Sequence, residues 1–123
     1  MFSFECRDGW EPSIRKIAEK LEKLIVKQIE KDPQGWEYGF YRTSQLKEKF
    51  GSGRWYLSAG TDEMLKLTDE WEEQTEHICE TCGKSGKIRG RGWLYASCWK
   101  HARKEDRDNL EYVEEEAKKR GLI

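Results

Sequence analysis

The chain has 123 residues, of which 36% are hydrophobic and 38% are charged, and its formal net charge is −1. This length predicts a single domain over 1–123, and the low apolar content predicts a small core, for which a metal ion commonly adds stability. No stretch approaches the ~20 apolar residues of a membrane span, and no N-terminal run resembles a signal peptide. We therefore expect a cytoplasmic protein that does not contact a membrane.

The first predicted element is an amphipathic helix over 12–31, where apolar residues recur at spacings of three and four. Pro12 suits the first turn of a helix, and Asp32 followed by Pro33 is expected to end it. The apolar stripe of this helix is predicted to pack on its own domain, and a homodimer seam is the alternative interpretation.

The segment 35–60 is rich in aromatic residues and punctuated by glycines, a composition typical of short strands. We predict two or three strands of a small antiparallel sheet, with a turn at 49–53 and the clearest strand at 54–58. Thr61 is expected to cap a second helix that runs to about His77. With the first helix, these elements form the helix–sheet–helix part of the domain, 1–77.

The remaining part, 78–123, contains the most specific motif of the chain. A CxxC pair, Cys79 and Cys82, is followed after fifteen residues by a CxxH pair, Cys98 and His101. Three thiolates and one imidazole complete the tetrahedral coordination of Zn²⁺. Because no coordination position is left for water or substrate, we predict one structural Zn²⁺.

The order of the zinc-binding segments predicts a treble-clef module within an α+β fold. A CxxC turn would be followed by a hairpin over 84–96 and then by a long C-terminal helix over 98–120. Cys98 and His101 are three residues apart, so in the first turn of that helix both would point to the same side.

The zinc module is also strongly basic, because 81–104 contains seven lysines and arginines and no acidic residue. Such a surface, with exposed aromatic rings, suits nucleic acid or a nucleotide-like anion. The alternative is that these charges only balance the thiolates of the metal site. The candidate anion-binding residues are Lys87, Arg89, Arg91, Trp93, Trp99, Lys100, Arg103 and Lys104.

The second helix carries the opposite charge, with seven acidic residues and only one lysine over 62–76. Its candidate protein-contact residues are Glu70, Glu72 and Glu73. A charge run of this kind is more often a solvated face, or it neutralises a basic patch of the same molecule.

A catalytic role has little support in the sequence. Only His77 and His101 are available as general bases, and His101 is assigned to the metal. The acidic residues lie in charge runs rather than in apolar surroundings that would shift a pKa. Cys6 is interpreted as a small, partly apolar core residue. We predict that the protein is not an enzyme.

Four segments together resemble a family of small uncharacterised proteins from bacteriophage and prophage genomes. They are Phe4-Glu5-Cys6-Arg7-Asp8-Gly9-Trp10, Leu46-Lys47-Glu48-Lys49-Phe50-Gly51, Arg54-Trp55-Tyr56, and Cys79-Glu80-Thr81-Cys82-Gly83 with Gly92-Trp93-Leu94 and the CxxH pair. Arg7 and Ser52-Gly53 depart from the family pattern. The resemblance implies a phage setting and the cytoplasm of a host cell, but no activity.

Two functions follow from these observations as hypotheses. In the first, the basic zinc module binds nucleic acid or another phosphate-bearing ligand. In the second, the chain inhibits a host defence protein, as anti-CRISPR factors do, by protein contact through its acidic helices.

Overall fold

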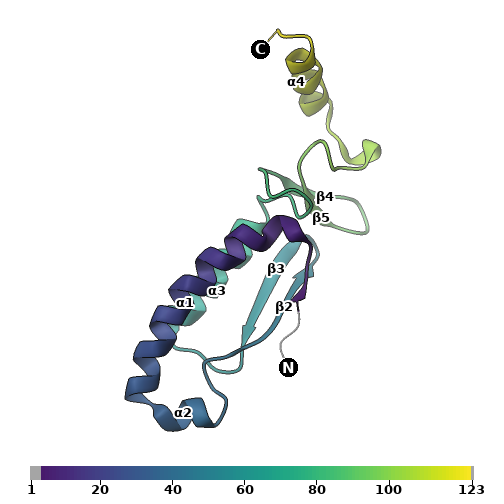
Figure 1. The fold of residues 1–123 in the computed structure, drawn as a ribbon. Coiled ribbons are helices and arrows are strands. Elements are labelled where there is room, and N and C mark those ends of the chain that lie inside the picture. The colour runs from purple at the N-terminus through teal and green to yellow at the C-terminus, as the bar shows by residue number, and fades with distance from the viewer. Residues whose placement is uncertain (1–3, 123) are drawn as a thin grey trace.

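The computed structural model describes residues 4–122, and their helices and small sheets confirm the predicted α+β class (Figure 1). Helices α1 and α3 pack against each other on one side of a three-stranded sheet, and α3 contacts strand β3. A second, two-stranded sheet lies at one end, beyond which α4 projects. The elements are β1 (Phe4–Glu5), η1 (Asp8–Trp10), α1 (Glu11–Lys31), α2 (Pro33–Glu37), β2 (Thr43–Lys49), β3 (Ser52–Leu57), α3 (Asp62–Thr75), β4 (Lys87–Arg89), β5 (Tyr95–Ser97), η2 (Lys104–Asp106) and α4 (Asn109–Lys119).

The two long helices agree with the sequence. Helix α1 has Pro12 in its first turn and ends at Lys31, and its residues Ile14, Ile17 and Leu21 are buried. Thr61 caps α3, because its side chain accepts a hydrogen bond from the backbone N–H of Met64.

The larger sheet is mixed rather than purely antiparallel. Strands β2 and β3 form the expected hairpin, with Leu46 opposite Trp55, whereas β1 adds to β2 in parallel. Pairing of Lys49 with Ser52 leaves only Phe50 and Gly51 in the turn. The parallel strand was not predicted because β1 has two residues, too few for a recognisable pattern.

The segment that follows α1 forms the short helix α2, where we had expected the aromatic strand region to begin. Pro33 occupies the first turn, and the Asp32 carboxylate accepts the backbone N–H of Gly35 at 2.9 Å. Asp32 therefore ends α1 and also caps α2.

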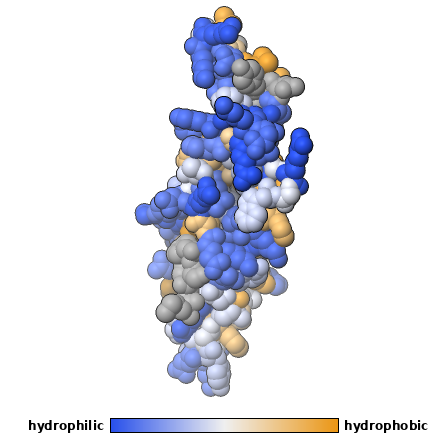
Figure 2. Space-filling model, turned by 90° about the vertical axis from the view of Figure 1, so that its right-hand side faces the viewer, coloured by the Kyte–Doolittle hydropathy of each residue, from blue (hydrophilic) through white to orange (hydrophobic). Residues whose placement is uncertain are grey.

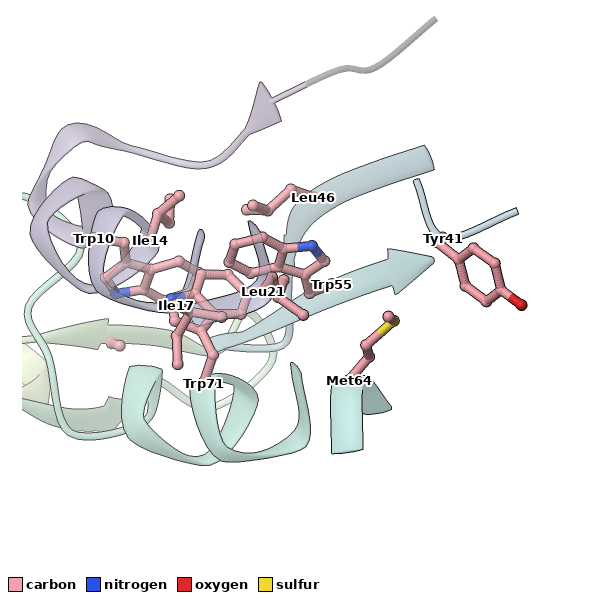
Figure 3. Close-up of a cluster of buried hydrophobic side chains, with 10 residues drawn as sticks. Trp10, Ile14, Ile17, Leu21, Tyr41, Leu46, Trp55, Met64 and Trp71 are labelled. Carbon is pink, nitrogen blue, oxygen red and sulfur yellow. The ribbon is translucent and has the colours of Figure 1, made fainter. Parts of the chain in front are cut away.

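The core lies between the two helices and the larger sheet, and tryptophans dominate it (Figure 3). The Trp71 ring lies edge-on to Trp10 and to Trp55, with centroid separations of 5.7 and 5.3 Å. Leu46 and Met64 are fully buried members of the same cluster. Large aromatic side chains thus compensate for the low apolar content, because each buries an extensive surface.

The outer surface of the molecule is largely polar. The side shown in Figure 2 is predominantly hydrophilic, and hydrophobic residues form separate small patches on it. No helix in the described part of the chain is long and apolar enough to cross a membrane. The single domain over 1–123 remains a prediction, and residues 1–3 and 123 lie outside the described residues.

The predicted long helix over 98–120 is wrong. A turn follows Cys98, η2 comes next, and α4 is a separate helix of 11 residues. The Trp99 carbonyl accepts the Arg107 guanidinium at 2.9 Å, and the Arg103 N–H donates to the Tyr95 hydroxyl. These side-chain hydrogen bonds replace the backbone pair between Arg103 and Trp99 that a continuous helix requires.

Candidate metal centre

The structure brings the four predicted ligands together. Cys79 and Cys82 lie in the turn that follows α3, Cys98 comes directly after β5, and His101 ends the next turn. Their ligating atoms all lie within 4.8 Å of one another, so the group could hold a metal ion. Two segments separated by fifteen residues supply the site, and the β4–β5 hairpin between them returns the chain to it.

The separations of the ligand atoms describe a compact site. The sulfur atoms of Cys82 and Cys98 are 3.8 Å apart. The Nδ1 atom of His101 lies 3.8 Å from the Cys79 sulfur and 3.2 Å from the Cys98 sulfur. One cation placed among these atoms can therefore reach all four.

The backbone of the CxxC turn is fixed by its own hydrogen bonds. The Cys79 N–H donates to the Lys84 carbonyl at 2.7 Å, and the Gly83 N–H donates to the Cys79 carbonyl at 2.9 Å. Gly83 has a φ of 81°, a conformation that glycine adopts without strain. The Glu80 N–H bonds to the Ala96 carbonyl at 3.0 Å and so attaches this turn to β5.

The thiols of the site differ in acidity. Burial alone would raise the pKa of Cys79, but backbone N–H groups, led by that of Cys98, lower it to about 6. Burial raises the pKa of Cys98, and the sulfur of Cys79 adds to this effect. Sulfur atoms this close together resist simultaneous ionisation because their thiolates repel one another. A bound cation would relieve this repulsion.

The N-terminal loop, residues 7–10 including the short helix η1, holds the CxxC turn against the core, a role that sequence analysis missed. The Gly9 N–H donates to the Glu80 carbonyl at 2.7 Å, and the Trp10 indole donates to the Ile78 carbonyl at 3.0 Å. A Cβ atom at Gly9 would lie 2.3 Å from the Cys79 carbonyl oxygen, so only glycine fits there. In the sequence, the adjacent Gly9 and Trp10 were the signal from which this contact could have been predicted.

Cys6 lies close to this loop but is not one of the four grouped ligands. It is partly buried and packs against the core, as expected. Burial, with the nearby Glu80 and Asp8 carboxylates, raises the pKa of its thiol to about 11.

Three hollows involve residues of the metal module, and one of them, the polar hollow, shares lining residues with each of the other two. The basic hollow has a volume of about 770 Å³, and Lys84, Lys87 and Lys100 line it together with Glu114 and Glu115. The polar hollow, of about 260 Å³, is lined by Arg7, Glu48, Glu80, Trp93 and Arg103. The aromatic hollow, of about 210 Å³, is lined by Lys49, Phe50, Trp93 and Leu94.

Most of the predicted anion-binding residues are exposed, whereas Arg89 is buried and Trp99 is half-buried in the fold. Arg89 is only 5% exposed, and its guanidinium donates to the Ser97 carbonyl at 3.0 Å. The Trp99 ring is half-buried, and the Arg107 guanidinium stacks 4.0 Å from its centroid. The exposed residues are Lys87, Arg91, Trp93, Lys100, Arg103 and Lys104.

The acidic residues on α3 also divide into two kinds. Glu70 and Glu73 are exposed, whereas the Glu72 carboxylate accepts the Trp55 backbone N–H at 2.9 Å. Glu72 therefore joins α3 to β3, and the candidate protein-contact surface is carried by Glu70 and Glu73.

Comparison with protein-family models, with curated proteins and with solved structures finds no significant match to this chain. The resemblance to phage proteins therefore stays a prediction.

Proposed function

We propose that the protein is a non-enzymatic, zinc-stabilised binding protein whose basic metal module contacts nucleic acid or another phosphate-bearing ligand. The observation that carries this proposal is the basic hollow beside the metal ligands, into which Lys84 and Lys100 bring exposed positive charge. Exposed lysines bind phosphates and release the counterions of a nucleic acid.

Zinc is the metal that the donor atoms favour. A Zn–S bond of about 2.3 Å in a tetrahedron places two sulfur ligands about 3.8 Å apart. The separation of 3.8 Å between the sulfurs of Cys82 and Cys98 agrees with this value. Four protein ligands leave no position for a reacting water, which supports a structural and not a catalytic metal. Metal analysis of the purified protein should find one Zn²⁺ per chain.

A treble-clef-like arrangement is part of the same proposal. The CxxC turn, the β4–β5 hairpin and the second ligand pair follow in the order that this module requires. The helix that would follow Cys98 directly is replaced by a turn and by η2.

The charges that remain available define the contact surface. Lys84, Lys100 and Arg91 are exposed, whereas Lys87 forms an ion pair with Asp108. Glu114 and Glu115 also line the basic hollow and oppose an anion on that side. We therefore assign the main phosphate contacts to Lys84 and Lys100, which are exposed and line the basic hollow.

A salt titration tests this assignment. Zinc-loaded protein would be titrated against labelled DNA and RNA oligonucleotides by fluorescence anisotropy at several salt concentrations. Each phosphate contact contributes about −0.7 to −0.9 to the slope of log K against log salt. The double variant Lys84→Glu and Lys100→Glu should flatten that slope by about 1.5.

The matched control reverses the same number of charges on α1, at Lys23 and Lys27, which are exposed and belong to the other part of the molecule. It should bind nearly as the wild type does. Equal affinity and slope in both double variants would contradict the basic hollow as the contact surface.

Protein contact through the acidic helix is the second candidate. Glu70 and Glu73 are exposed, and among the described residues neither takes part in an ion pair, which favours an outward role over internal charge balance. In a phage setting the partner would be a host defence protein. A partner retained from nuclease-treated host lysate, and lost from Glu70→Lys with Glu73→Lys, would support this function; retention by that double variant would contradict it.

A further inference from the structure

Phe50 has a strained backbone conformation, and its side chain is not buried. Its φ is 55°, in the left-handed region that bulky side chains avoid, and its side chain is 63% exposed. Tyr41 has a similar φ of 62°, but it is buried, and its hydroxyl donates to Asp32 at 2.6 Å. Burial and a hydrogen bond offset the strain at Tyr41, whereas Phe50 has little burial to offset its own.

The turn that contains Phe50 does not need an aromatic residue. Phe50 and Gly51, whose φ is 83°, form the two-residue connection of the β2–β3 hairpin. Positive φ at both positions is the type I′ pattern, for which Asn-Gly is the preferred pair. The Gly51 N–H donates to the Glu48 carboxylate at 2.7 Å, which fixes the turn without the Phe50 ring. A strained, exposed ring in such a turn is therefore available for a ligand.

A second exposed ring lies across the aromatic hollow. Trp93 is 71% exposed in the loop between β4 and β5, and it lines this hollow together with Phe50. The Lys49 ammonium lies 5.7 Å from the centroid of the Phe50 ring, so a positive charge accompanies the aromatic pair. Two hairpins, one from each sheet, thus present their rings to the same space.

The polar hollow lies between the aromatic hollow and the basic hollow of the metal module, because it shares lining residues with each of them. Trp93 lines both the aromatic and the polar hollow, and His101 lines both the polar and the basic hollow. Arg7 and Arg103 line the polar hollow. Glu48 and Glu80 also line the polar hollow, but their carboxylates accept hydrogen bonds from the backbone N–H groups of Gly51 and Arg7, respectively.

We propose that Phe50 and Trp93 form a stacking site for an unpaired nucleobase, so that the ligand of the basic metal module is single-stranded nucleic acid. This inference rests on the proposed function. Aromatic rings accept the faces of bases, and lysines accept the phosphates that follow along the strand. A duplex hides the faces of its bases, so it can use the basic hollow but not the aromatic one.

The experiment compares two 12-nucleotide probes with a 5′ fluorescein: oligothymidine, and a fully abasic strand that carries phosphates without bases. Anisotropy titrations would use the full zinc-loaded chain. Wild type should bind oligothymidine about 5- to 150-fold more tightly than the abasic strand, the range expected for stacking one base on an aromatic residue. Trp93→Ala should lose most of this preference while its affinity for the abasic strand stays unchanged.

Phe50→Asn separates a binding role from a structural one. Asparagine suits the type I′ turn better than phenylalanine, so the variant should melt at a higher temperature and still bind oligothymidine less tightly. Tyr38→Ala is the control, because Tyr38 is 77% exposed just after α2, at the opposite end of the molecule from the β4–β5 hairpin (Figure 1). It should change neither binding constant.

Two results would overturn the inference in distinguishable ways. Equal binding of both probes, or an unchanged preference in Trp93→Ala and Phe50→Asn, would refute base stacking and leave the proposed phosphate contacts intact. Absence of binding to either probe at low salt would refute the proposed function as well, and would turn the search to a protein ligand.

Discussion

The helix–sheet part of the chain and the metal module are stabilised in different ways. In the first part, α1, α3 and the larger sheet enclose fully buried Trp10, Trp71 and Leu46. Burial of such side chains contributes about 1.5–3 kcal/mol for each large apolar residue. This part therefore has a core of its own, built from large side chains.

The metal module encloses far less apolar material. Among the residues that the structure describes, its buried apolar side chains are those of Cys79, Ala96 and Ala102, which are all small, and Ala96 packs into the main core. Its strands β4 and β5 have three residues each, which is too short for independent stability. The low apolar content of the sequence is therefore not spread evenly: one part has a core, and the other depends on its ligands and on contacts to the first.

The largest expected effect comes from removing the metal. A structural Zn²⁺ contributes on the order of 10 kcal/mol, which is comparable to the whole stability of a small domain. A chelator, or Cys82→Ser, should therefore lower the melting temperature severely. Amide exchange should become fast over 78–101 before it does so in α1 and α3. Metal-free protein that melts as the loaded protein does would contradict the difference between the two parts.

The next largest effect is expected in the tryptophan core. Trp71 is fully buried between Trp10 and Trp55, so Trp71→Ala should reduce the free energy of unfolding by about 3–5 kcal/mol in urea denaturation. The exposed Trp93 supplies the control, since Trp93→Ala should change stability by less than about 0.5 kcal/mol. Release of the metal at the same urea concentration as loss of the core would show that the two parts unfold as one unit.

The sequence predicted those features that depend on local patterns. The apolar spacing of α1, the cap at Thr61 and the two pairs of metal ligands are each visible within a few neighbouring residues. The grouping of these ligands was predictable as well, because the spacing of Cys and His residues reflects the geometry of the metal.

Features that depend on contacts between distant segments were not predictable. Helix α4 starts late because Arg107 and Tyr95 take the backbone groups at Trp99 and Arg103 that a continuous helix would pair. Arg89 belonged to the basic run, but the fold buries it. The fit of Gly9 against Cys79 joins segments about seventy residues apart, and no local pattern contains that distance.

The third prediction concerns this contact between the two parts. In Gly9→Ala the new Cβ atom would lie 2.3 Å from the Cys79 carbonyl oxygen, so the N-terminal loop or the CxxC turn must move. We expect a loss of about 1–3 kcal/mol in stability, as for other overpacked sites, and faster transfer of the metal to a chelator. Gly92→Ala is the control, because no atom lies within 4 Å of its Cβ position. Similar metal release from both variants would contradict the proposed role of the loop in holding the metal site.

The smallest effect is expected at the far end of the helix–sheet part, where Tyr41 donates a hydrogen bond to Asp32. This bond, with the Gly35 N–H, holds the pKa of Asp32 below its ordinary value of 3.8, and it raises the pKa of Tyr41 above 10.0. The contribution of Asp32 to stability is therefore present above pH 4 and is lost as the pH falls through its lowered pKa. The contribution of Tyr41 is present below pH 10 and is lost as the pH rises through its raised pKa. Melting temperatures measured across this range should thus fall at both ends in the wild type and less steeply in Tyr41→Phe, with the metal still bound at neutral pH. Identical pH profiles in the two proteins would show that this pair does not link protonation to folding.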